Sequence, residues 1–222
     1  MKVKIKTGDD YQIFEYNGEL NISVITLIER LDAPIEYSCS CLQGICGACA
    51  MLINSQPRLA CKTFLNEERM VIEYDQITIE PLSKFPLIKD LKVDRSILFD
   101  VLNDCEIWLE NDCEYDGQDL DFEYEMSLCL MCGCCSEVCP NYKLGDFAGA
   151  HLAVSASKLV NQESDEKHLK NIKNNYKKHF FSHCVKSTAC EDVCPMKIPT
   201  QRAISKMNRK SVWKIWQLLN RD

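Results

Sequence analysis

Two stretches decide the fold of this chain: Cys129-Leu-Met-Cys132-Gly-Cys134-Cys135-Ser-Glu-Val-Cys139-Pro140 and Cys184-Val-Lys-Ser-Thr-Ala-Cys190-Glu-Asp-Val-Cys194-Pro195. The first has the spacing C-x2-C-x2-C-x3-C-P, in which three cysteines bind one iron–sulfur cluster and the fourth binds another. The second stretch repeats the C-x3-C-P ending but has Ser187 where a middle cysteine would stand. Because clusters of this kind share ligands between distant segments, we expect the two stretches to fold against each other.

The crossing-ligand rule divides these cysteines between two centres. One [4Fe–4S] cluster takes three ligands from the first stretch and one from the second: Cys129, Cys132, Cys135 and Cys194. The other centre takes Cys139, Cys184 and Cys190, and its fourth corner faces Ser187. Three thiolates suit a [3Fe–4S] centre, whereas a serine oxygen on a fourth iron is the less favoured alternative. Zinc ribbons or plain core thiols would explain neither the proline endings nor the serine.

A third cysteine-rich segment lies near the N-terminus. Cys41, Cys46 and Cys49 have the plant-type spacing C-x4-C-x2-C, and Cys61 follows. This spacing holds a [2Fe–2S] cluster, for which thiolates are the preferred soft ligands, and it is favoured over a zinc loop. Cys39 leaves an ambiguity because it could replace Cys41 in the ligand set.

The composition supports metal ligation over a disulfide scaffold. The chain has 15 cysteines in 222 residues, an odd number, and it opens on MKVKIKTGDD, which does not resemble a secretory signal. It contains no apolar run long enough to span a membrane. The net charge of −7 argues against nucleic acid as a partner. We expect the isolated Cys105 to be buried as a small hydrophobic residue, likewise Cys113; Cys134 has no role in the motif.

Local patterns predict a mixed first half and a helical second half. Alternating apolar residues predict a hairpin over 2–6 and 11–16, and strands over 50–54 and 70–74. Helical spacing is seen over 21–31, from Ser96 onward, over 148–159 and 167–180, and within 197–220. The fold class is therefore α+β. A β-grasp, plant-type [2Fe–2S] ferredoxin domain over 1–95 precedes an all-helical, two-cluster α-helical ferredoxin domain over 96–222.

The ordered set of motifs resembles the iron–sulfur subunit of succinate dehydrogenase and fumarate reductase. Besides the cysteine stretches, the resemblance covers Pro57-Arg58-Leu59-Ala60-Cys61-Lys62-Thr63 and Pro86-Leu87-Ile88-Lys89-Asp90-Leu91. It implies an electron-transfer subunit in which three centres connect the FAD of a flavoprotein subunit to a quinone in a membrane anchor. The carbon chemistry then belongs to the flavoprotein, and the subunit is peripheral, at the cytoplasmic face of the cell membrane.

Departures from that family pattern bear on the quinone. After Pro140 the ubiquinone-using members carry tryptophans, whereas this chain has Asn141 and Tyr142 in a shortened loop. These differences favour menaquinol and net fumarate reduction. We name His183 and Lys206 as candidate quinone-proximal residues. The alternatives are a subunit of a thiol-linked fumarate reductase or another flavoprotein oxidoreductase and, from a different class, a zinc-binding structural protein.

Overall fold

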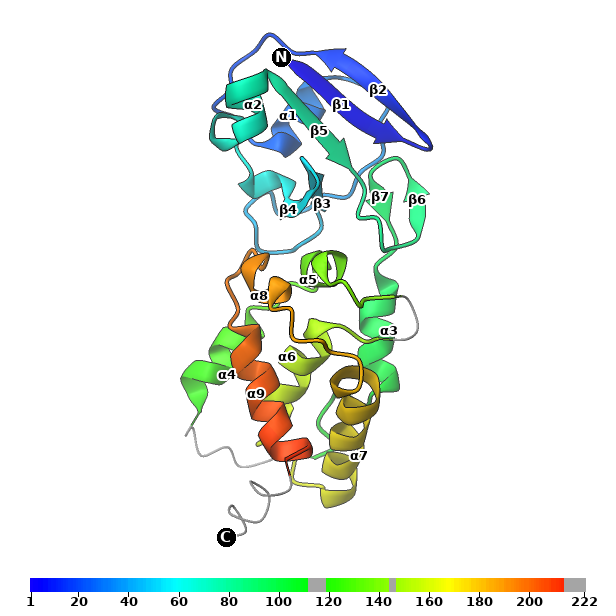
Figure 1. The fold of residues 1–222 in the computed structure, drawn as a ribbon, viewed down its shortest axis with the longest axis vertical. Helices are drawn as coiled ribbons and strands as arrows, with labels where there is room; N and C mark the ends of the chain where they lie inside the picture. Colours follow the sequence, from blue (N-terminus) through cyan, green and yellow to red (C-terminus); the bar gives the residue numbers. More distant parts are fainter. Residues whose placement is uncertain (112–118, 144–146, 214–222) are drawn as a thin grey trace. The chain divides into compact units, whose positions relative to one another are not determined.

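The computed structural model describes residues 1–111, 119–143 and 147–213. The chain divides into two compact units (Figure 1). The first contains Met1–Arg95 together with Cys132–Val138, and the second contains Ser96–Met131 and the remainder. None of the helices in the described part of the chain has the length and apolar character needed to cross a bilayer.

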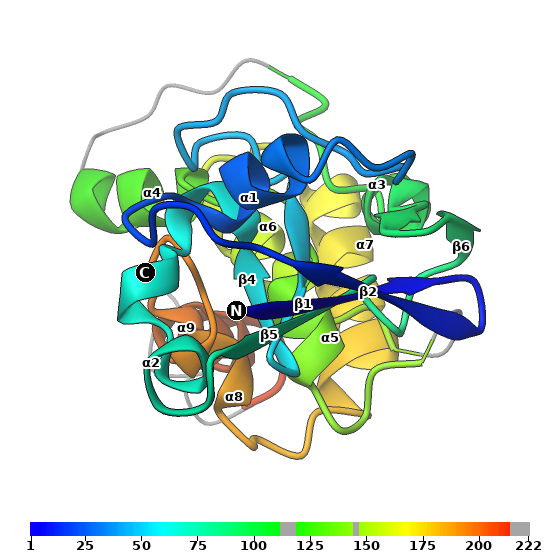
Figure 2. The same cartoon turned by 90° about the horizontal axis from the view of Figure 1, so that it is seen from above.

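The first unit is built on a five-stranded sheet in the order β2-β1-β5-β3-β4. Its strands are β1 (Lys2–Thr7), β2 (Asp10–Glu15), β3 (Ala50–Ile53), β4 (Gln56–Leu59) and β5 (Gln76–Glu80). Strands β1 and β5 run parallel, and the other pairs are antiparallel. Figures 1 and 2 show β1 between β2 and β5. A separate hairpin joins β6 (Leu87–Lys89) and β7 (Lys92–Val93). The expected β-grasp ferredoxin domain is thus confirmed.

Helix α1 (Val24–Arg30) supplies much of the core of this unit. Its N-cap is Ser23, whose side chain accepts a hydrogen bond from the Thr26 N–H at 3.3 Å, as Ser commonly does at this position. Val24, Ile25, Leu27 and Ile28 are all buried. They recur at helical spacing, so the sequence pattern and the observed burial agree.

The strand expected over 70–74 is wrong. Helix α2 (Arg69–Tyr74) occupies this segment, and it ends at Asp75 in the left-handed conformation with φ 51°. Val71 is buried, whereas Ile72 and Tyr74 are 66% and 59% exposed. A run this short fits both the helical and the strand period, and only the next segment, β5, finds a partner by pairing with β1.

The second unit is helical. Its helices are α3 (Ser96–Asp104), α4 (Leu120–Ser127), α6 (Ala150–Leu159), α7 (Glu166–Tyr176), α8 (Ala189–Asp192) and α9 (Thr200–Ser211), and a π-helical turn, Lys177–Phe181, extends α7. Helices α4, α6, α7 and α9 pack together (Figure 1). Phe122, Met126, Val154, Ile198 and Ala203 form a core cluster. The end of the helix expected within 197–220 lies outside the described residues.

The segment Cys132–Val138, which contains helix α5 (Cys134–Val138), folds with the first unit instead of the contiguous domain expected over 96–222. The reason is the buried carboxylate of Glu137. It accepts hydrogen bonds from the Ser83 N–H at 3.0 Å, the Ser83 hydroxyl at 2.5 Å and the Lys84 N–H at 3.0 Å. A buried carboxylate needs such donors, so this contact fixes the segment to the loop after β5.

Charged residues of α9 pair with carboxylates in and before α4, within the second unit. Lys206 Nζ lies 2.6 Å from Asp119 Oδ2, and Arg202 Nη1 lies 2.9 Å from Glu125 Oε2. Both cations also lie over the Phe122 ring, at 5.0 Å for Arg202 and 4.1 Å for Lys206. Part of the positive charge of α9 is therefore neutralised inside the unit itself.

Candidate iron–sulfur sites

The N-terminal loop brings its four expected ligands together. Cys49 Sγ lies 3.3 Å from Cys61 Sγ, although the two residues are 12 positions apart. Cys41 and Cys46 also interact through their side chains, and the charge of Cys46 acts on Cys49. Strand β3 starts directly after Cys49, and Cys61 lies in a 3-10 turn, Ala60–Lys62, directly after β4. The antiparallel pairing of β3 and β4 thus sets the Cys49–Cys61 contact.

Backbone N–H groups of the loop point at the sulfurs. Gln43 N and Ile45 N each lie 3.4 Å from Cys41 Sγ, and Ala48 N lies 3.4 Å from Cys46 Sγ. The hydrogen bonds from Gln43 and Ile45 are the main reason why the pKa of the Cys41 thiol falls to about 6. Donors of this kind stabilise thiolate ligands and help to set the potential of an iron–sulfur centre.

Burial acts in the opposite direction on Cys49, where it raises the pKa to about 12. A thiol buried in this way needs a metal to become a thiolate, because the ion's charge offsets the cost of burying the anion. The loop conformation depends on Gly44 and Gly47, which have φ angles of 74° and 73°. The donor set and the N–H groups fit an iron–sulfur cluster bound in this loop.

Cys39 lies near two of the expected ligands of the N-terminal loop, Cys46 and Cys61. Burial, then the charge of Glu29, raises the pKa of its thiol, and Cys46 and Cys61 act in the same direction. The residue is nevertheless exposed, whereas Cys41 is the sulfur that receives the Gln43 and Ile45 N–H groups. The geometry therefore favours Cys41 as the ligand.

In the second unit, Cys139, Cys184 and Cys190 interact electrostatically. Burial raises the pKa of both Cys184 and Cys190, and the charge of Cys139 adds to the rise in each case. Cys184 follows the π-helical turn and donates its N–H to the Phe180 carbonyl, and Cys190 lies in α8. These three thiols come from three separate segments and lie near enough to influence one another's pKa, and Ser187 is exposed.

The four cysteines expected to hold the [4Fe–4S] cluster belong to different units. Cys129 and Cys194 pack against the same core cluster of the second unit, so the tertiary fold brings these distant residues together. Ile198 N lies 3.5 Å from Cys194 Sγ. Cys132 and Cys135 belong to the first unit.

Two residues around Cys132 have roles that the sequence did not reveal. Cys134 is fully buried, and its hydrogen bond is the main reason why the pKa of the Cys132 thiol falls to about 7. Arg95 also lowers that pKa by its charge. The Arg95 guanidinium donates to the carbonyls of Gly47 at 2.6 Å, Ala48 at 3.1 Å and Cys132 at 3.0 Å. Arg95 thus connects the N-terminal cluster loop to the first cysteine stretch. No sequence pattern around this single arginine indicates that it makes these contacts.

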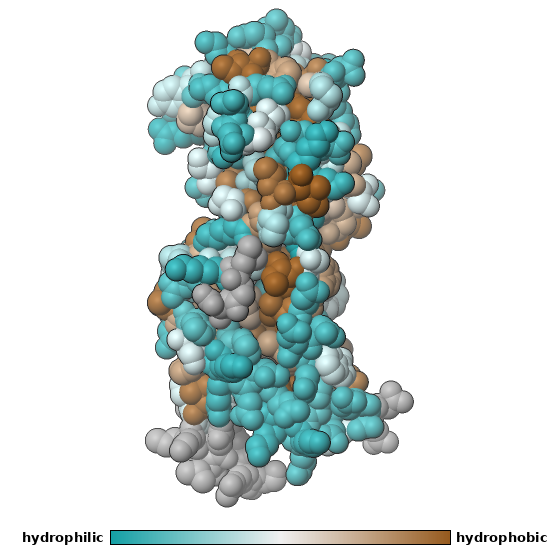
Figure 3. Space-filling view, turned by 90° about the vertical axis from the view of Figure 1, so that its right-hand side faces the viewer, coloured by the Kyte–Doolittle hydropathy of each residue, from teal (hydrophilic) through white to brown (hydrophobic). Residues whose placement is uncertain are grey.

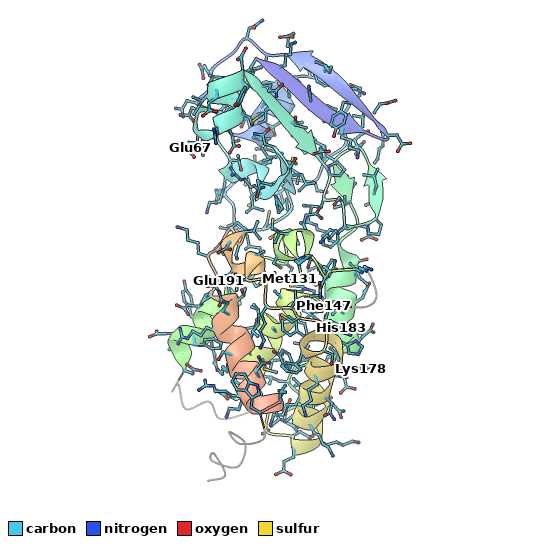
Figure 4. The ribbon with its side chains drawn as sticks, in the orientation of Figure 1. Glu67, Met131, Phe147, Lys178, His183 and Glu191 are labelled. Carbon is cyan, nitrogen blue, oxygen red and sulfur yellow. The ribbon has the colours of Figure 1, made fainter. Side chains whose placement is uncertain are left out.

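Cys105 is 2% exposed, as expected, and burial raises its pKa to about 11. Cys113 lies outside the described residues. The two candidate quinone residues differ in their surroundings. His183 is exposed, lies next to Phe147 (Figure 4) and has its carbonyl bound by the Asn141 side chain at 2.7 Å. Lys206 is 6% exposed and already engaged with Asp119 and Phe122.

A β-grasp unit with a four-thiol loop, followed by a helical unit with crossed cysteine stretches, defines a multi-cluster iron–sulfur protein of electron transfer. Two family models match the chain: a 2Fe-2S iron-sulfur cluster binding domain over residues 3–100, and a 4Fe-4S dicluster domain over residues 125–198.

Similar proteins show which family of iron–sulfur proteins the chain belongs to. The fumarate reductase iron-sulfur subunit of Wolinella succinogenes is 31% identical over 219 residues, which cover 91% of this chain and 89% of the relative. The succinate dehydrogenase iron-sulfur subunit of Bacillus subtilis is 30% identical, over 79% of this chain and 72% of the relative. A chain of the Mycobacterium smegmatis Sdh1 complex in the apo form has the same fold, with a TM-score of 0.79, 22% identity and 94% coverage of both chains. The chain belongs to the family of succinate dehydrogenase and fumarate reductase iron–sulfur subunits.

Proposed function

We propose that this chain relays electrons between the FAD of a flavoprotein subunit and a quinone held by a membrane anchor, at the cytoplasmic face of the cell membrane. The relay uses [2Fe–2S], [4Fe–4S] and [3Fe–4S] centres, bound by the cysteine sets named above. Succinate and fumarate chemistry takes place in the flavoprotein. These clusters supply one-electron carriers, and the residues of this chain hold them, exclude water from them and set their potentials.

The observation that carries the proposal is that the thiols of Cys139, Cys184 and Cys190, called the three-thiol site below, influence one another electrostatically, while Ser187 is exposed. Three thiols ligate three irons, and the residue in the position of a fourth ligand is a serine that faces solvent. This arrangement supports a [3Fe–4S] centre over a second [4Fe–4S] cluster.

The surface of the first unit supports a protein partner at the N-terminal cluster. Leu42 and Ile45 lie between Cys41 and Cys46 in the cluster loop and are 49% and 62% exposed. Figure 3 shows that, on one face, apolar surface forms small patches among largely hydrophilic residues. Exposed apolar side chains beside a redox centre suit a docking surface, because a partner that covers them also shortens the electron path. We assign this surface to the flavoprotein.

The quinone end of the proposal depends on the segment after Pro140. Tyr142 is 4% exposed, so it packs inward, and Asn141 binds the carbonyl of the exposed His183. Where ubiquinone-using members carry tryptophans, this chain thus has a buried tyrosine and an asparagine whose amide binds the His183 carbonyl. We take this as support for menaquinol as the donor and for net fumarate reduction.

Two measurements test the proposal on the complex of this chain with its flavoprotein and anchor. A three-iron EPR signal is expected in the wild-type complex, and Ser187→Cys should convert it to a [4Fe–4S] centre of lower potential. Ser182→Cys, a substitution at an exposed serine just before His183, is the matched control and should leave the signal unchanged. Iron-free, zinc-loaded protein, or a three-iron signal that persists in Ser187→Cys, contradicts the assignment.

The direction of electron flow is tested by steady-state rates. A naphthoquinol with fumarate should give faster turnover than succinate with ubiquinone. The opposite ratio would overturn the assignment to fumarate reduction. Activity only with thiol donors would instead place the chain in a thiol-linked fumarate reductase.

A further inference from the structure

The hydroxyl of Thr200 lies against the three-thiol site. Thr200 Oγ1 is 3.4 Å from Cys190 Sγ, and the residue is 3% exposed, so water does not compete for this contact. Thr200 is the first residue of helix α9, and Cys190 lies in α8, which packs against α9. The loop between the two helices thus places a hydroxyl beside a cysteine that the proposed function makes a cluster ligand.

A second acceptor competes for the same hydroxyl proton. Glu191 Oε2 also lies 3.4 Å from Thr200 Oγ1, and it accepts the Gln201 N–H at 2.7 Å. The N-cap of α9 is Pro199, which has no side-chain hydrogen bond to the helix. Glu191 therefore takes over the capping of the first turn, where a carboxylate is favoured by the helix dipole. Its capping bond to the Gln201 N–H holds the carboxylate close to Thr200.

The distances indicate which acceptor Thr200 prefers once Cys190 is a thiolate. A hydroxyl normally lies 2.5–3.0 Å from an oxygen acceptor, roughly, so 3.4 Å to Glu191 is long. Sulfur is larger than oxygen, and 3.4 Å is an ordinary separation for an O–H···S contact. A thiolate ligand has no proton to donate, so in the loaded protein Thr200 is the donor and Cys190 the acceptor.

We propose that Thr200 tunes the potential of the centre bound by Cys139, Cys184 and Cys190: its hydroxyl donates to Cys190 and stabilises the reduced state, and Glu191 limits this by competing for the proton. The inference rests on the proposed function, since it needs a redox centre at these thiols. Reduction adds one electron, supplied through the flavoprotein or the quinol, and no bond is formed or broken. The proton stays on the Thr200 oxygen, and the hydrogen bond shortens as negative charge on the sulfur grows.

The test is an EPR-monitored redox titration of the three-iron signal in the complete complex. Thr200→Val keeps the shape but removes the donor, so the ratio of reduced to oxidised centre at a fixed potential should fall by up to about tenfold. For a one-electron couple, tenfold corresponds to about 59 mV. Thr200→Ser keeps a hydroxyl and should restore the ratio to within about twofold of wild type.

Glu191→Gln supplies a second, independent test that also serves if Thr200→Val fails to assemble the site. The amide oxygen can still accept the Gln201 N–H, but the charge and the stronger competing acceptor are gone, so the ratio should rise. Loss of charge alone raises the ratio equally with and without the Thr200 hydroxyl. Competition for the proton makes the rise at least about twofold larger in the Thr200 background than in the Thr200→Val background.

Hyperfine spectroscopy separates tuning from a purely structural role. A solvent-exchangeable proton coupled to the centre should be present in wild type and Thr200→Ser and absent in Thr200→Val. An unshifted potential in Thr200→Val with the three-iron signal intact overturns the inference and leaves the proposed function standing. An equal rise for Glu191→Gln in both backgrounds also overturns it. A wild-type complex without any three-iron signal overturns the proposed function and this inference with it.

Discussion

Replacing Glu137 with alanine should release the Cys132–Val138 segment from the first unit. The Glu137 carboxylate is 8% exposed and accepts three hydrogen bonds, two of them from the backbone N–H groups of Ser83 and Lys84. Alanine leaves these two N–H groups without their acceptor, at about 1–3 kcal/mol each. Because water can enter the space left by the side chain, we expect the free energy of unfolding of the first unit to fall by about 3 kcal/mol in total. Glu137→Gln keeps an oxygen acceptor, so it should lower this free energy by about half as much.

The assay follows the loss of each unit separately at a fixed urea concentration. Trp108 and Trp213, the tryptophans among the described residues, belong to the second unit, so tryptophan fluorescence is used to follow it. Visible circular dichroism of the [2Fe–2S] cluster reports on the first unit. If the Glu137 contacts are broken in the unfolding transition state, 3 kcal/mol accelerates loss of the visible signal by about a hundredfold.

A matched control is Glu73→Ala on α2 of the same unit. Glu73 pairs with Arg69 at 2.9 Å on the exposed side of the helix, and such pairs contribute at most about 0.5 kcal/mol. The rate should therefore change by less than about threefold. The reasoning is refuted if Glu137→Ala behaves like this control, or if it accelerates only the loss of tryptophan fluorescence.

Three further outcomes are expected. Cys41→Ala should abolish the [2Fe–2S] EPR signal, whereas Cys39→Ala should leave it intact, and equal loss in both would mean that the ligand choice is wrong. His151 is buried, and burial lowers its pKa from the ordinary 6.5 to about 4, so the unfolded chain binds more protons between these values. The contribution of neutral His151 to stability is fully present above about pH 6.5, and about 3 kcal/mol of it is lost as the pH drops to 4. His151→Leu should therefore reduce the pH dependence of stability in acid denaturation curves. An unchanged pH dependence would show that burial does not lower the pKa of His151. Lys206→Met should destabilise the helical unit by about 1–2 kcal/mol, because the buried ammonium pairs with Asp119. The same variant should leave the KM for quinol unchanged, and a raised KM would instead place Lys206 at the quinone.

Much of the site could be predicted because ligand spacing is a local property of the chain. The loop from Cys41 to Cys49 needs its glycines and its C-x4-C-x2-C order in one short segment, so the sequence displays the whole motif. The same holds for the endings at Cys139-Pro140 and Cys194-Pro195.

The strand expected at 70–74 was wrong because its outcome depended on contacts with distant residues and not on a local pattern. Over five residues the helical and strand periods of apolar residues cannot be distinguished. The pairing of β5 with β1 decided that β5, and not residues 70–74, became the strand.

The sequence by itself determined the α+β order of the chain and predicted the kinds of ligand and their grouping into three sets, since all of these follow from residue type and spacing. Tertiary structure alone decided that Cys132–Val138 folds with the first unit, because a buried carboxylate on Glu137 found its donors in Ser83 and Lys84. It also decided that Arg95 and Thr200 face the thiol-bearing segments. Hydrogen bonds between residues so far apart in the chain depend on where packing brings the backbone, and no local pattern records them.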